Sequence, residues 1–177
     1  VAEGRCDAVE MTRAQIADAD LVAKLAAGTP ERVRPCILCN QTCIVRDARN
    51  PIVTCVVDPR TGHELTEPEP AGSTTAVTIV GGGVAGLEAA RVAATSGAAV
   101  RLVEAAPTTG GMLRTASAGS GRARLALFAD WLDAECRRLG VEIETGHPVE
   151  AAELGDSSAL DVGDEVSLRV IDRGVGA

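Results

Sequence analysis

The sequence lacks the features that would place it in a membrane, in a secretory pathway or on nucleic acid. No apolar run approaches the length needed to cross a bilayer, and no segment resembles a signal peptide. Basic residues are too few for a general nucleic-acid binder, since 17 lysines and arginines stand against 25 aspartates and glutamates and leave a net charge of −8. We therefore expect a cytoplasmic protein that binds neither nucleic acid nor membranes.

An initiating methionine is also missing, because the chain begins at Val1. Its first residues already resemble the middle of a fold, so we expect a fragment of a longer protein. The residues that are present suffice for a core: 46% of the 177 are hydrophobic, which predicts a globular chain. The sequence leaves the oligomeric state open.

The first third of the chain has few signals of regular structure. Residues 6–11 are expected to form a strand. Asp20 is expected to cap a helix over residues 21–27, and Gly28 ends it in the left-handed conformation. Residues 34–62 predict a loop-rich segment, because its prolines exclude long regular elements. A stretch with few apolar residues and many chain-breaking ones follows and is predicted to be a linker.

A regular α/β pattern begins after this linker. Residues 76–80 predict a buried strand, and an alanine- and leucine-rich helix then continues to about Ser96, where a glycine ends it. Residues 99–103 and 141–144 predict two further strands. A helix between them has apolar residues at spacings of three and four: Leu125, Phe128, Trp131, Leu132, Cys136 and Leu139. This order predicts an α/β fold, a Rossmann-like parallel sheet that binds FAD or NAD.

Four of the six cysteines form the most specific motif in the chain. Cys36, Cys39, Cys43 and Cys55 follow the spacing C-x2-C-x3-C-x11-C, which allows their thiolates to converge on one metal centre. A disulfide pair suits a reducing cytosol poorly. A four-cysteine zinc site more often pairs two C-x2-C knuckles, and this chain has one. An iron–sulfur cluster with four cysteine ligands fits the spacing best, with zinc as the alternative.

The neighbours of these cysteines are compatible with a negatively charged cluster. Arg34, Arg46 and Arg49 lie close by in the sequence, although a solvated surface explains these arginines equally well. Backbone N–H groups of residues 40–42 are expected to reach the sulfurs. Such hydrogen bonds tune the reduction potential of a cluster.

The remaining cysteines and several acidic residues are assigned no chemistry. Cys6 lies on the first predicted strand and Cys136 on the apolar helix face, so both are expected to be small core residues. The acidic residues of the same helix are expected to form a solvated face: Asp130, Asp133 and Glu135. No catalytic residue is predicted.

The glycine-rich turn after residue 80 matches the dinucleotide-binding pattern G-x-G-x-x-G in its required context, between a strand and a helix. Gly81 makes the turn, Gly83 lets the backbone approach a pyrophosphate, and Gly86 lets helix and strand pack closely. Glu104, at the end of the next strand, is placed to accept hydrogen bonds from a ribose. The loop leaves FAD, NAD and ADP open, and Gly110-Gly111 favours FAD because its backbone can pass close to an extended flavin nucleotide.

Two motifs in this order resemble the old-yellow-enzyme-type iron–sulfur flavoproteins, the group of 2,4-dienoyl-CoA reductase and trimethylamine dehydrogenase. Residues 34–43, RPCILCNQTC, with Cys55 and Asp58-Pro59, resemble the cluster motif of that family. Residues 80–90 resemble its flavin-nucleotide fingerprint. Residues 6–18 are similar to the last strand of its FMN-binding barrel, with a local pattern slightly closer to the mycofactocin-associated members.

The resemblance implies a division of the chain into five parts. In order, these are the end of an FMN-binding TIM barrel, an iron–sulfur cluster loop, a linker, a partial Rossmann-like dinucleotide-binding domain and an irregular tail. They span residues 1–33, 34–62, 63–75, 76–150 and 151–177.

The resemblance also implies the cofactors and their ligands. FMN in the barrel handles the substrate, a [4Fe–4S] cluster transfers single electrons, and the nucleotide domain holds FAD or only ADP, with NAD(P)H as the reductant. The four motif cysteines would bind the cluster, and Arg13 would hold the FMN phosphate. Positions matching those that contact the dinucleotide are Ala85, Glu104, Met112, Leu113 and Val149.

The function implied is that of a fragment of an NAD(P)H-dependent iron–sulfur flavin oxidoreductase that acts on an enoyl, dienoyl or amine-type substrate. This small-molecule substrate would bind in a barrel that the chain does not contain, so the chain alone is expected to be inactive. Two alternatives stand beside this hypothesis: a zinc-stapled nucleotide-binding module without redox activity, and an inactive truncated product.

Overall fold

The computed structural model describes residues 1, 3–44, 49, 52–66, 72 and 76–150. The chain divides into two compact units, Val1–Glu67 and Pro68–Ala177, and the boundary lies within the residues 63–75 predicted as a linker. The predicted tail, 151–177, lies outside the described residues, as does part of that linker. Within the described residues, no helix has both the length and the apolar composition needed to span a bilayer.

The first unit consists of short helices joined by loops. Helix α1 spans Arg13–Ala17, α2 spans Leu21–Ala26, and a 3-10 helix, η1, spans Pro30–Arg32. The strand predicted at residues 6–11 is wrong, because those residues form no strand. A strand needs a neighbouring strand for its backbone hydrogen bonds, and no described residue of this unit belongs to one.

The predicted helix ends are partly correct. Gly28 follows α2 with φ +73°, and the Thr29 N–H donates back to the Lys24 carbonyl at 3.0 Å, as expected of a left-handed helix terminus. Asp20 precedes α2, but its side chain makes no capping hydrogen bond. The neighbouring Asp18 side chain instead accepts the Asp20 N–H at 3.1 Å. The side-chain hydrogen bond at the start of α2 is therefore made by the Asp18 carboxylate and not by that of Asp20.

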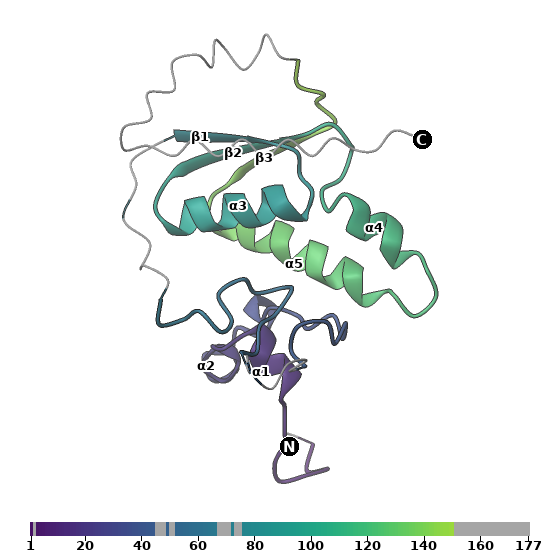
Figure 1. The fold of residues 1–177 in the computed structure, drawn as a ribbon. Coiled ribbons are helices and arrows are strands. Elements are labelled where there is room, and N and C mark those ends of the chain that lie inside the picture. The colour runs from purple at the N-terminus through teal and green to yellow at the C-terminus, as the bar shows by residue number, and fades with distance from the viewer. Residues whose placement is uncertain (2, 45–48, 50–51, 67–71, 73–75, 151–177) are drawn as a thin grey trace. The chain divides into compact units, whose positions relative to one another are not determined.

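The second unit is built on a three-stranded parallel sheet. Strands β1 (Ala76–Val80), β2 (Ala99–Glu104) and β3 (Glu142–Thr145) lie in the order β1-β2-β3, with Leu102 opposite both Ile79 and Ile143 (Figure 1). The central strand contributes fully buried side chains to the core. This arrangement confirms the predicted Rossmann-like α/β fold.

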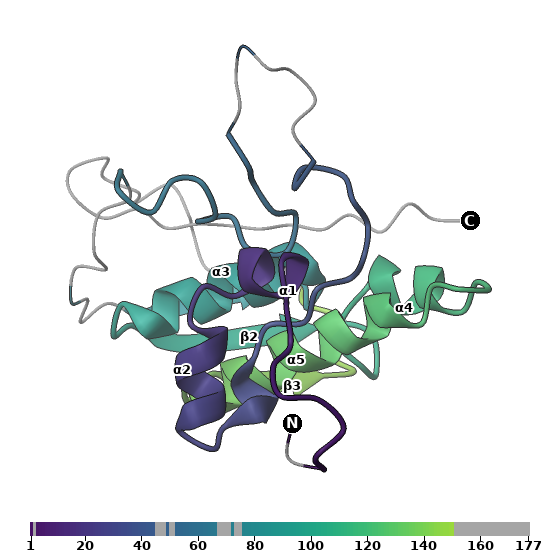
Figure 2. The same ribbon diagram turned by 90° about the horizontal axis from the view of Figure 1, so that it is seen from below.

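Three helices lie among the described residues of this unit: α3 (Val84–Thr95), α4 (Met112–Ser117) and α5 (Arg124–Arg138). Helices α3 and α5 pack side by side on one face of the sheet (Figures 1 and 2). Gly97, with φ +90°, follows the end of α3 as predicted. Helix α4 was expected to be loop, because its six residues are too few for a periodic pattern.

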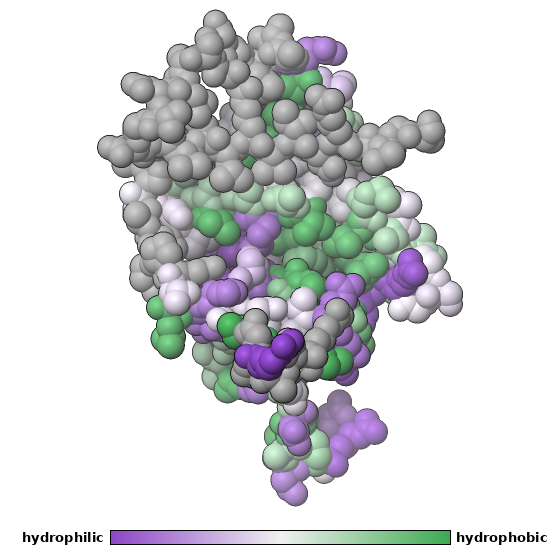
Figure 3. Space-filling view, viewed as in Figure 1, coloured by the Kyte–Doolittle hydropathy of each residue, from purple (hydrophilic) through white to green (hydrophobic). Residues whose placement is uncertain are grey.

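The predicted apolar face of α5 forms the centre of the core. Phe128, Trp131, Leu132 and Cys136 are buried, and the two aromatic rings stack with their centroids 6.2 Å apart. The space-filling view shows apolar surface over the helices of this unit, where side chains such as Val92 on α3 remain exposed (Figure 3). The core of this unit lies where α3 packs against both the sheet and α5.

Candidate functional site

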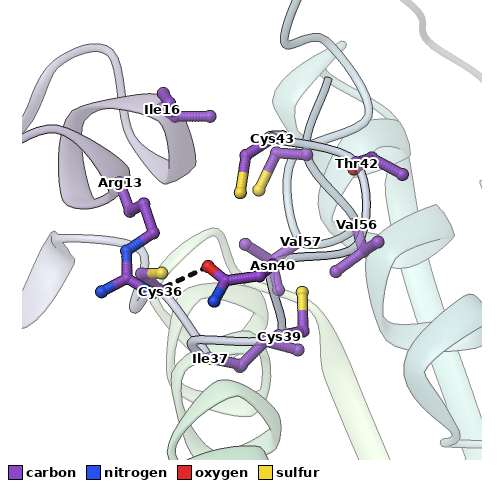
Figure 4. A pocket seen from close by; sticks show the side chains of 11 residues that line it. Arg13, Ile16, Cys36, Ile37, Cys39, Asn40, Thr42, Cys43, Val56 and Val57 are labelled. Atoms are coloured by element: carbon purple, nitrogen blue, oxygen red, sulfur yellow. Dashed lines mark hydrogen bonds between the residues drawn. The ribbon is translucent and has the colours of Figure 1, made fainter. Parts of the chain in front are cut away.

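The four motif cysteines line one pocket in the first unit. Cys36, Cys39, Cys43 and Cys55 surround it, and residues from α1 and the cysteine loop complete its wall. Figure 4 shows the sulfurs of the three labelled cysteines turned toward a common space. Cys55 reaches it from twelve positions beyond Cys43, so folding joins the outlying member of the motif to the other three.

The thiols around this pocket are not gathered at the ligand distances of one bound ion. Four thiolates on one zinc ion, each about 2.3 Å from it, would lie within about 4 Å of one another. Among the described residues, no three Cys, His, Asp or Glu side chains come together closely enough to hold one metal ion. Four thiols around one pocket are compatible with an iron–sulfur cluster and with zinc, and the spacing of the motif in the sequence favours the cluster.

Backbone strain accompanies this arrangement. Leu38 and Asn40 have φ of +58° and +50°, the left-handed region that non-glycine residues avoid at a cost of about 1–2 kcal/mol each. In this conformation the Leu38 N–H donates to the Cys36 sulfur at 3.4 Å. The sequence predicted donors at residues 40–42, whereas the N–H group seen at a sulfur is that of Leu38.

The arginines near the cysteines occupy different environments. Arg34 is only 4% exposed, and its guanidinium donates to the Val57 carbonyl, so interpreting Arg34 as part of a solvated surface is wrong. Arg49 is exposed, and Arg46 lies outside the described residues. Arg13, implied by the resemblance to hold an FMN phosphate, lines the cysteine pocket and donates to Asn40 Oδ1 at 2.8 Å (Figure 4).

The glycine-rich turn of the second unit has the geometry that the motif predicts. Gly81 has φ +104°, and its N–H donates to the Val103 carbonyl at 2.8 Å, tying the turn to β2. A Cβ on Gly86 would lie 1.9 Å from the Gly81 carbonyl oxygen, so no side chain fits there. Gly83 lies at the amino end of α3, whose unpaired N–H groups are suited to an anion.

Glu104 lies at the predicted place, at the carboxyl end of β2, and its side chain has backbone partners. One carboxylate oxygen accepts the Gly82 N–H at 2.5 Å, and the other accepts the Ala106 N–H at 2.7 Å. Glu104 thus fastens the glycine turn to the loop after β2. Because a carboxylate has about four acceptor positions, two remain for a ribose hydroxyl.

A second loop closes against the glycine turn. The Gly110 N–H donates to the Gly82 carbonyl at 2.7 Å, and Gly110 and Gly111 have φ of +104° and +49°. Thr109 is buried beside them and donates from its hydroxyl to Asp133 Oδ1 on α5 at 2.8 Å. The sequence has no spacing signal for this contact, because its partners lie 24 positions apart on different elements.

Asp133 and Glu135 do not belong to the solvated face predicted for the acidic residues of α5, whereas Asp130 is exposed as predicted. Glu135 is 8% exposed and bonds Arg138 at 2.8 Å, while Asp133 accepts both Thr109 and Arg137. The remaining member of that set, Asp130, forms an ion pair with an arginine of α4. Two of these three carboxylates thus join α5 to the preceding loop and helix.

The other residues predicted to contact the dinucleotide follow the carboxyl ends of the strands in the sequence. Ala85 is exposed in the first turn of α3, and Met112, 72% exposed, begins α4 with Leu113 beside it. Val149 lies shortly after β3. Ligands of open parallel sheets bind at this edge, so the fold places all the predicted positions at a suitable edge of the sheet.

The two cysteines outside the motif differ from each other. Cys136 is fully buried, its thiol donates to the Leu87 carbonyl at 3.2 Å, and burial raises its pKa to about 12. Its prediction as a core residue is confirmed. Cys6 is exposed, so the same prediction for Cys6 is wrong, because the strand that would have buried it does not form.

Comparison with known proteins adds a family and relatives. The family described as "Pyridine nucleotide-disulphide oxidoreductase" matches residues 60–176. The chain is 41% identical over 154 residues to an NADH oxidase of Thermoanaerobacter brockii, covering 85% of this chain and 24% of that protein. It is 40% identical over 162 residues to a multifunctional alkene reductase/demethylase OYE of Caballeronia cordobensis, covering 90% of this chain and 23% of that protein.

A solved structure agrees with these relatives. A 2-naphthoyl-CoA reductase in complex with 2-naphthoyl-CoA superposes with a TM-score of 0.80 at 32% identity, over 86% of this chain and 24% of that one. The chain thus spans about a quarter of the length of the proteins it matches. The predicted resemblance to old-yellow-enzyme-type iron–sulfur flavoproteins is confirmed by these homologues.

Proposed function

The chain belongs to the pyridine nucleotide-disulphide oxidoreductase family, and from that premise we propose that it is the cluster-binding and FAD-binding part of an NAD(P)H-dependent iron–sulfur flavin oxidoreductase. Its relatives are oxidoreductases, among them an NADH oxidase and an alkene reductase. The observation that supports the proposal most strongly is the single pocket lined by four cysteines. We propose a cytoplasmic location for the protein.

The first proposed role belongs to the four thiolates. Cys36, Cys39, Cys43 and Cys55 would hold a [4Fe–4S] cluster, which supplies one-electron transfer between FAD and FMN. The Leu38 N–H, at 3.4 Å from the Cys36 sulfur, would stabilise the more negative, reduced state. Arg13, which donates to Asn40, would place a positive charge at the edge of the same pocket and would also hold an FMN phosphate.

The second proposed role belongs to the edge of the sheet. The glycine turn and the amino end of α3 would bind the pyrophosphate of FAD, since Gly81 and Gly83 bring the backbone close and the N–H groups favour an anion. Glu104 would accept a ribose hydroxyl with its free acceptor positions. Gly110 and Gly111 would pass beside the extended flavin nucleotide, with further contacts at Ala85, Met112, Leu113 and Val149.

The whole protein is proposed to act on a small molecule of the enoyl, dienoyl or amine type. That proposal is supported by the similar proteins named above, which include an alkene reductase/demethylase and a 2-naphthoyl-CoA reductase. The substrate would bind in an FMN-containing barrel, of which residues 1–33 are proposed to be the end.

Analysis of metal and nucleotide content tests the proposal. Protein purified without oxygen is expected to contain about four iron and four sulfide ions for each chain, and to release FAD on denaturation. The quadruple change of the four motif cysteines to serine should lose iron and sulfide and keep FAD. Zinc without sulfide in the wild type would overturn the cluster assignment, and ADP without flavin would overturn the FAD assignment.

A further inference from the structure

Arg34 connects the two ends of the chain segment that contains all four motif cysteines. It lies two residues before Cys36, and its guanidinium donates to the carbonyl of Val57, two residues after Cys55. This hydrogen bond closes the segment into a loop with the outer cysteines next to its base. Arg34 is not among the residues that line the cysteine pocket, and its bond to Val57 acts on the thiols through the backbone.

The base of this loop is buried and held from a second direction. Arg34 and Val57 are 4% and 2% exposed. The Arg34 N–H donates to Asp18 Oδ2 at 2.7 Å, and Asp18, itself 4% exposed, also accepts the Lys24 ammonium at 2.6 Å. Because the arginine is fixed at both its backbone and its guanidinium, it can hold the Val57 carbonyl at a set distance.

A second connection ties the middle of the loop. The Thr42 hydroxyl donates to the Thr54 carbonyl at 3.0 Å, and the Thr54 N–H donates to the Thr42 carbonyl at 3.3 Å. Each threonine directly precedes a motif cysteine, Cys43 and Cys55 respectively. The separation of these two cysteines is therefore also restricted by hydrogen bonds that involve no metal ligand.

We propose that Arg34 is a positioning residue that, together with the Thr42–Thr54 pair, sets the separation of the four thiols before any metal binds. This inference rests on the proposed function, since it concerns the same pocket. If the segment became ordered only on metal binding, its loss of chain entropy would lower the affinity for the metal. When folding sets these separations first, less chain entropy is lost during binding and the metal binds more tightly.

Release of the cluster to a chelator tests the positioning role. The full chain, reconstituted without oxygen from ferrous iron and sulfide, is mixed with a strong iron chelator, and the loss of the visible thiolate–iron absorption is followed. We expect Arg34→Gln to release iron about tenfold faster than the wild type, as loss of outer ligand support typically does. Thr42→Val, which removes one exposed hydrogen bond, should release it about threefold faster.

Arg60→Gln is the matched control. Arg60 lies in the same unit, its side chain is 53% exposed, and it contacts Asp58 but not the pocket. Its release rate should equal that of the wild type. The electron paramagnetic resonance spectrum of the reduced cluster should change in the Arg34 and Thr42 variants and stay unchanged in the Arg60 variant, since it senses thiolate geometry and not global stability.

Wild-type release rates and spectra in both folded variants would overturn the proposal. If Arg34→Gln fails to fold, Thr42→Val decides alone, because its hydroxyl is at the surface and its loss should not unfold the unit. If the wild type takes up zinc and no sulfide, the cluster proposal fails, but zinc release from the same three variants still tests the positioning role. The two failures are therefore distinguishable.

Discussion

At the scale of single residues, the proposed nucleotide site depends on positions where an added Cβ atom would have no space. It also depends on a carboxylate whose loss would leave backbone N–H groups without their acceptor. The glycine turn approaches both α3 and Glu104 so closely that a Cβ on Gly82 would lie 3.0 Å from the Glu104 Cβ. Glu104 in turn accepts two backbone N–H groups that would otherwise lack a side-chain acceptor. These residues shape the binding edge before a nucleotide arrives.

Gly86→Ala should destabilise the second unit severely. Its Cβ would lie 1.9 Å from the Gly81 carbonyl, a backbone atom that cannot move without opening the turn. We expect a loss of about 3 kcal/mol or more in unfolding free energy. Urea unfolding followed by fluorescence of Trp131, the single tryptophan, measures it. Gly72→Ala, whose Cβ would meet no atom within 4 Å, is the control, and equal losses in both variants would contradict this account.

The raised pKa of Cys136 predicts that the free energy of unfolding depends on pH. Burial, and then the charge of Asp133, raises its pKa from 9.0 to about 12, so above pH 9 the unfolded chain loses a proton that the folded chain keeps. The stabilising effect of this thiol is present below that pH and declines as the pH rises toward 12. The stability difference between wild type and Cys136→Ala should therefore narrow between about pH 8 and about pH 10.

The comparison needs a buried control without a titrating group. Ala129→Gly is suitable, because Ala129 is fully buried on the same helix. Its loss of stability should be the same at both pH values, measured again by Trp131 fluorescence in urea. A difference for Cys136→Ala that stays constant or widens would show that the thiol does not titrate as described.

At the scale of elements, the loop between β2 and α4 is held by α5 and not by its own turn residues alone. Thr109 bonds Asp133 at 2.8 Å, and Arg114 donates to the Thr109 carbonyl at 2.9 Å. The adjoining Gly110 then reaches the glycine turn through Gly82. The amphipathic helix thus supports both loops of the nucleotide edge, in addition to filling the core.

Thr109→Val should separate the support that α5 gives to the nucleotide edge from its packing in the core. It keeps the buried volume but leaves Asp133 without its hydroxyl donor, at a cost of about 1–3 kcal/mol. We expect a comparable loss in affinity for ADP, measured by calorimetry, because the loop beside the glycine turn loosens. Thr108→Val is the control, since Thr108 is exposed. Unchanged ADP affinity in Thr109→Val would show that α5 does not support the nucleotide edge.

At the scale of the whole molecule, the two units have very different cores. Among the described residues, the buried apolar side chains of the first unit are Ala17, Leu21 and Val57, whereas the second unit buries twelve, from β1, β2, α3, α5 and Val141. A small core rarely stabilises a unit without a metal or a disulfide. We therefore expect the first unit to depend on the proposed metal centre for its stability, and the second to depend on packing.

Removal of the metal should affect the units unequally. Treatment with a chelator is expected to raise amide hydrogen exchange throughout residues 13–57, because metal-binding free energy is part of the folding free energy there. Exchange in residues 76–150 should stay the same. Mass spectrometry of exchanged peptides measures both, with the cysteine-to-serine variant as the metal-free reference. An equal rise in both units would contradict the account.

Local features of the chain were predictable because their physics is local. Four cysteines within twenty positions, a strand that leads into a glycine turn and a helix with one apolar face each depend on neighbours along the sequence. Their elements appear in the structure with boundaries shifted by a residue or two, as at β3. The sequence by itself therefore determined the Rossmann-like fold, and it singled out the four cysteines as one motif.

Tertiary structure decided the interactions that join distant residues. The buried bond from Arg34 to Val57, the contact of Thr109 with Asp133 and that of Glu104 with Gly82 each link residues at least 22 positions apart. The strand expected at residues 6–11 did not form, because a strand exists only with a partner strand. Side-chain partners across a fold are chosen by packing, and no periodicity in the chain encodes them.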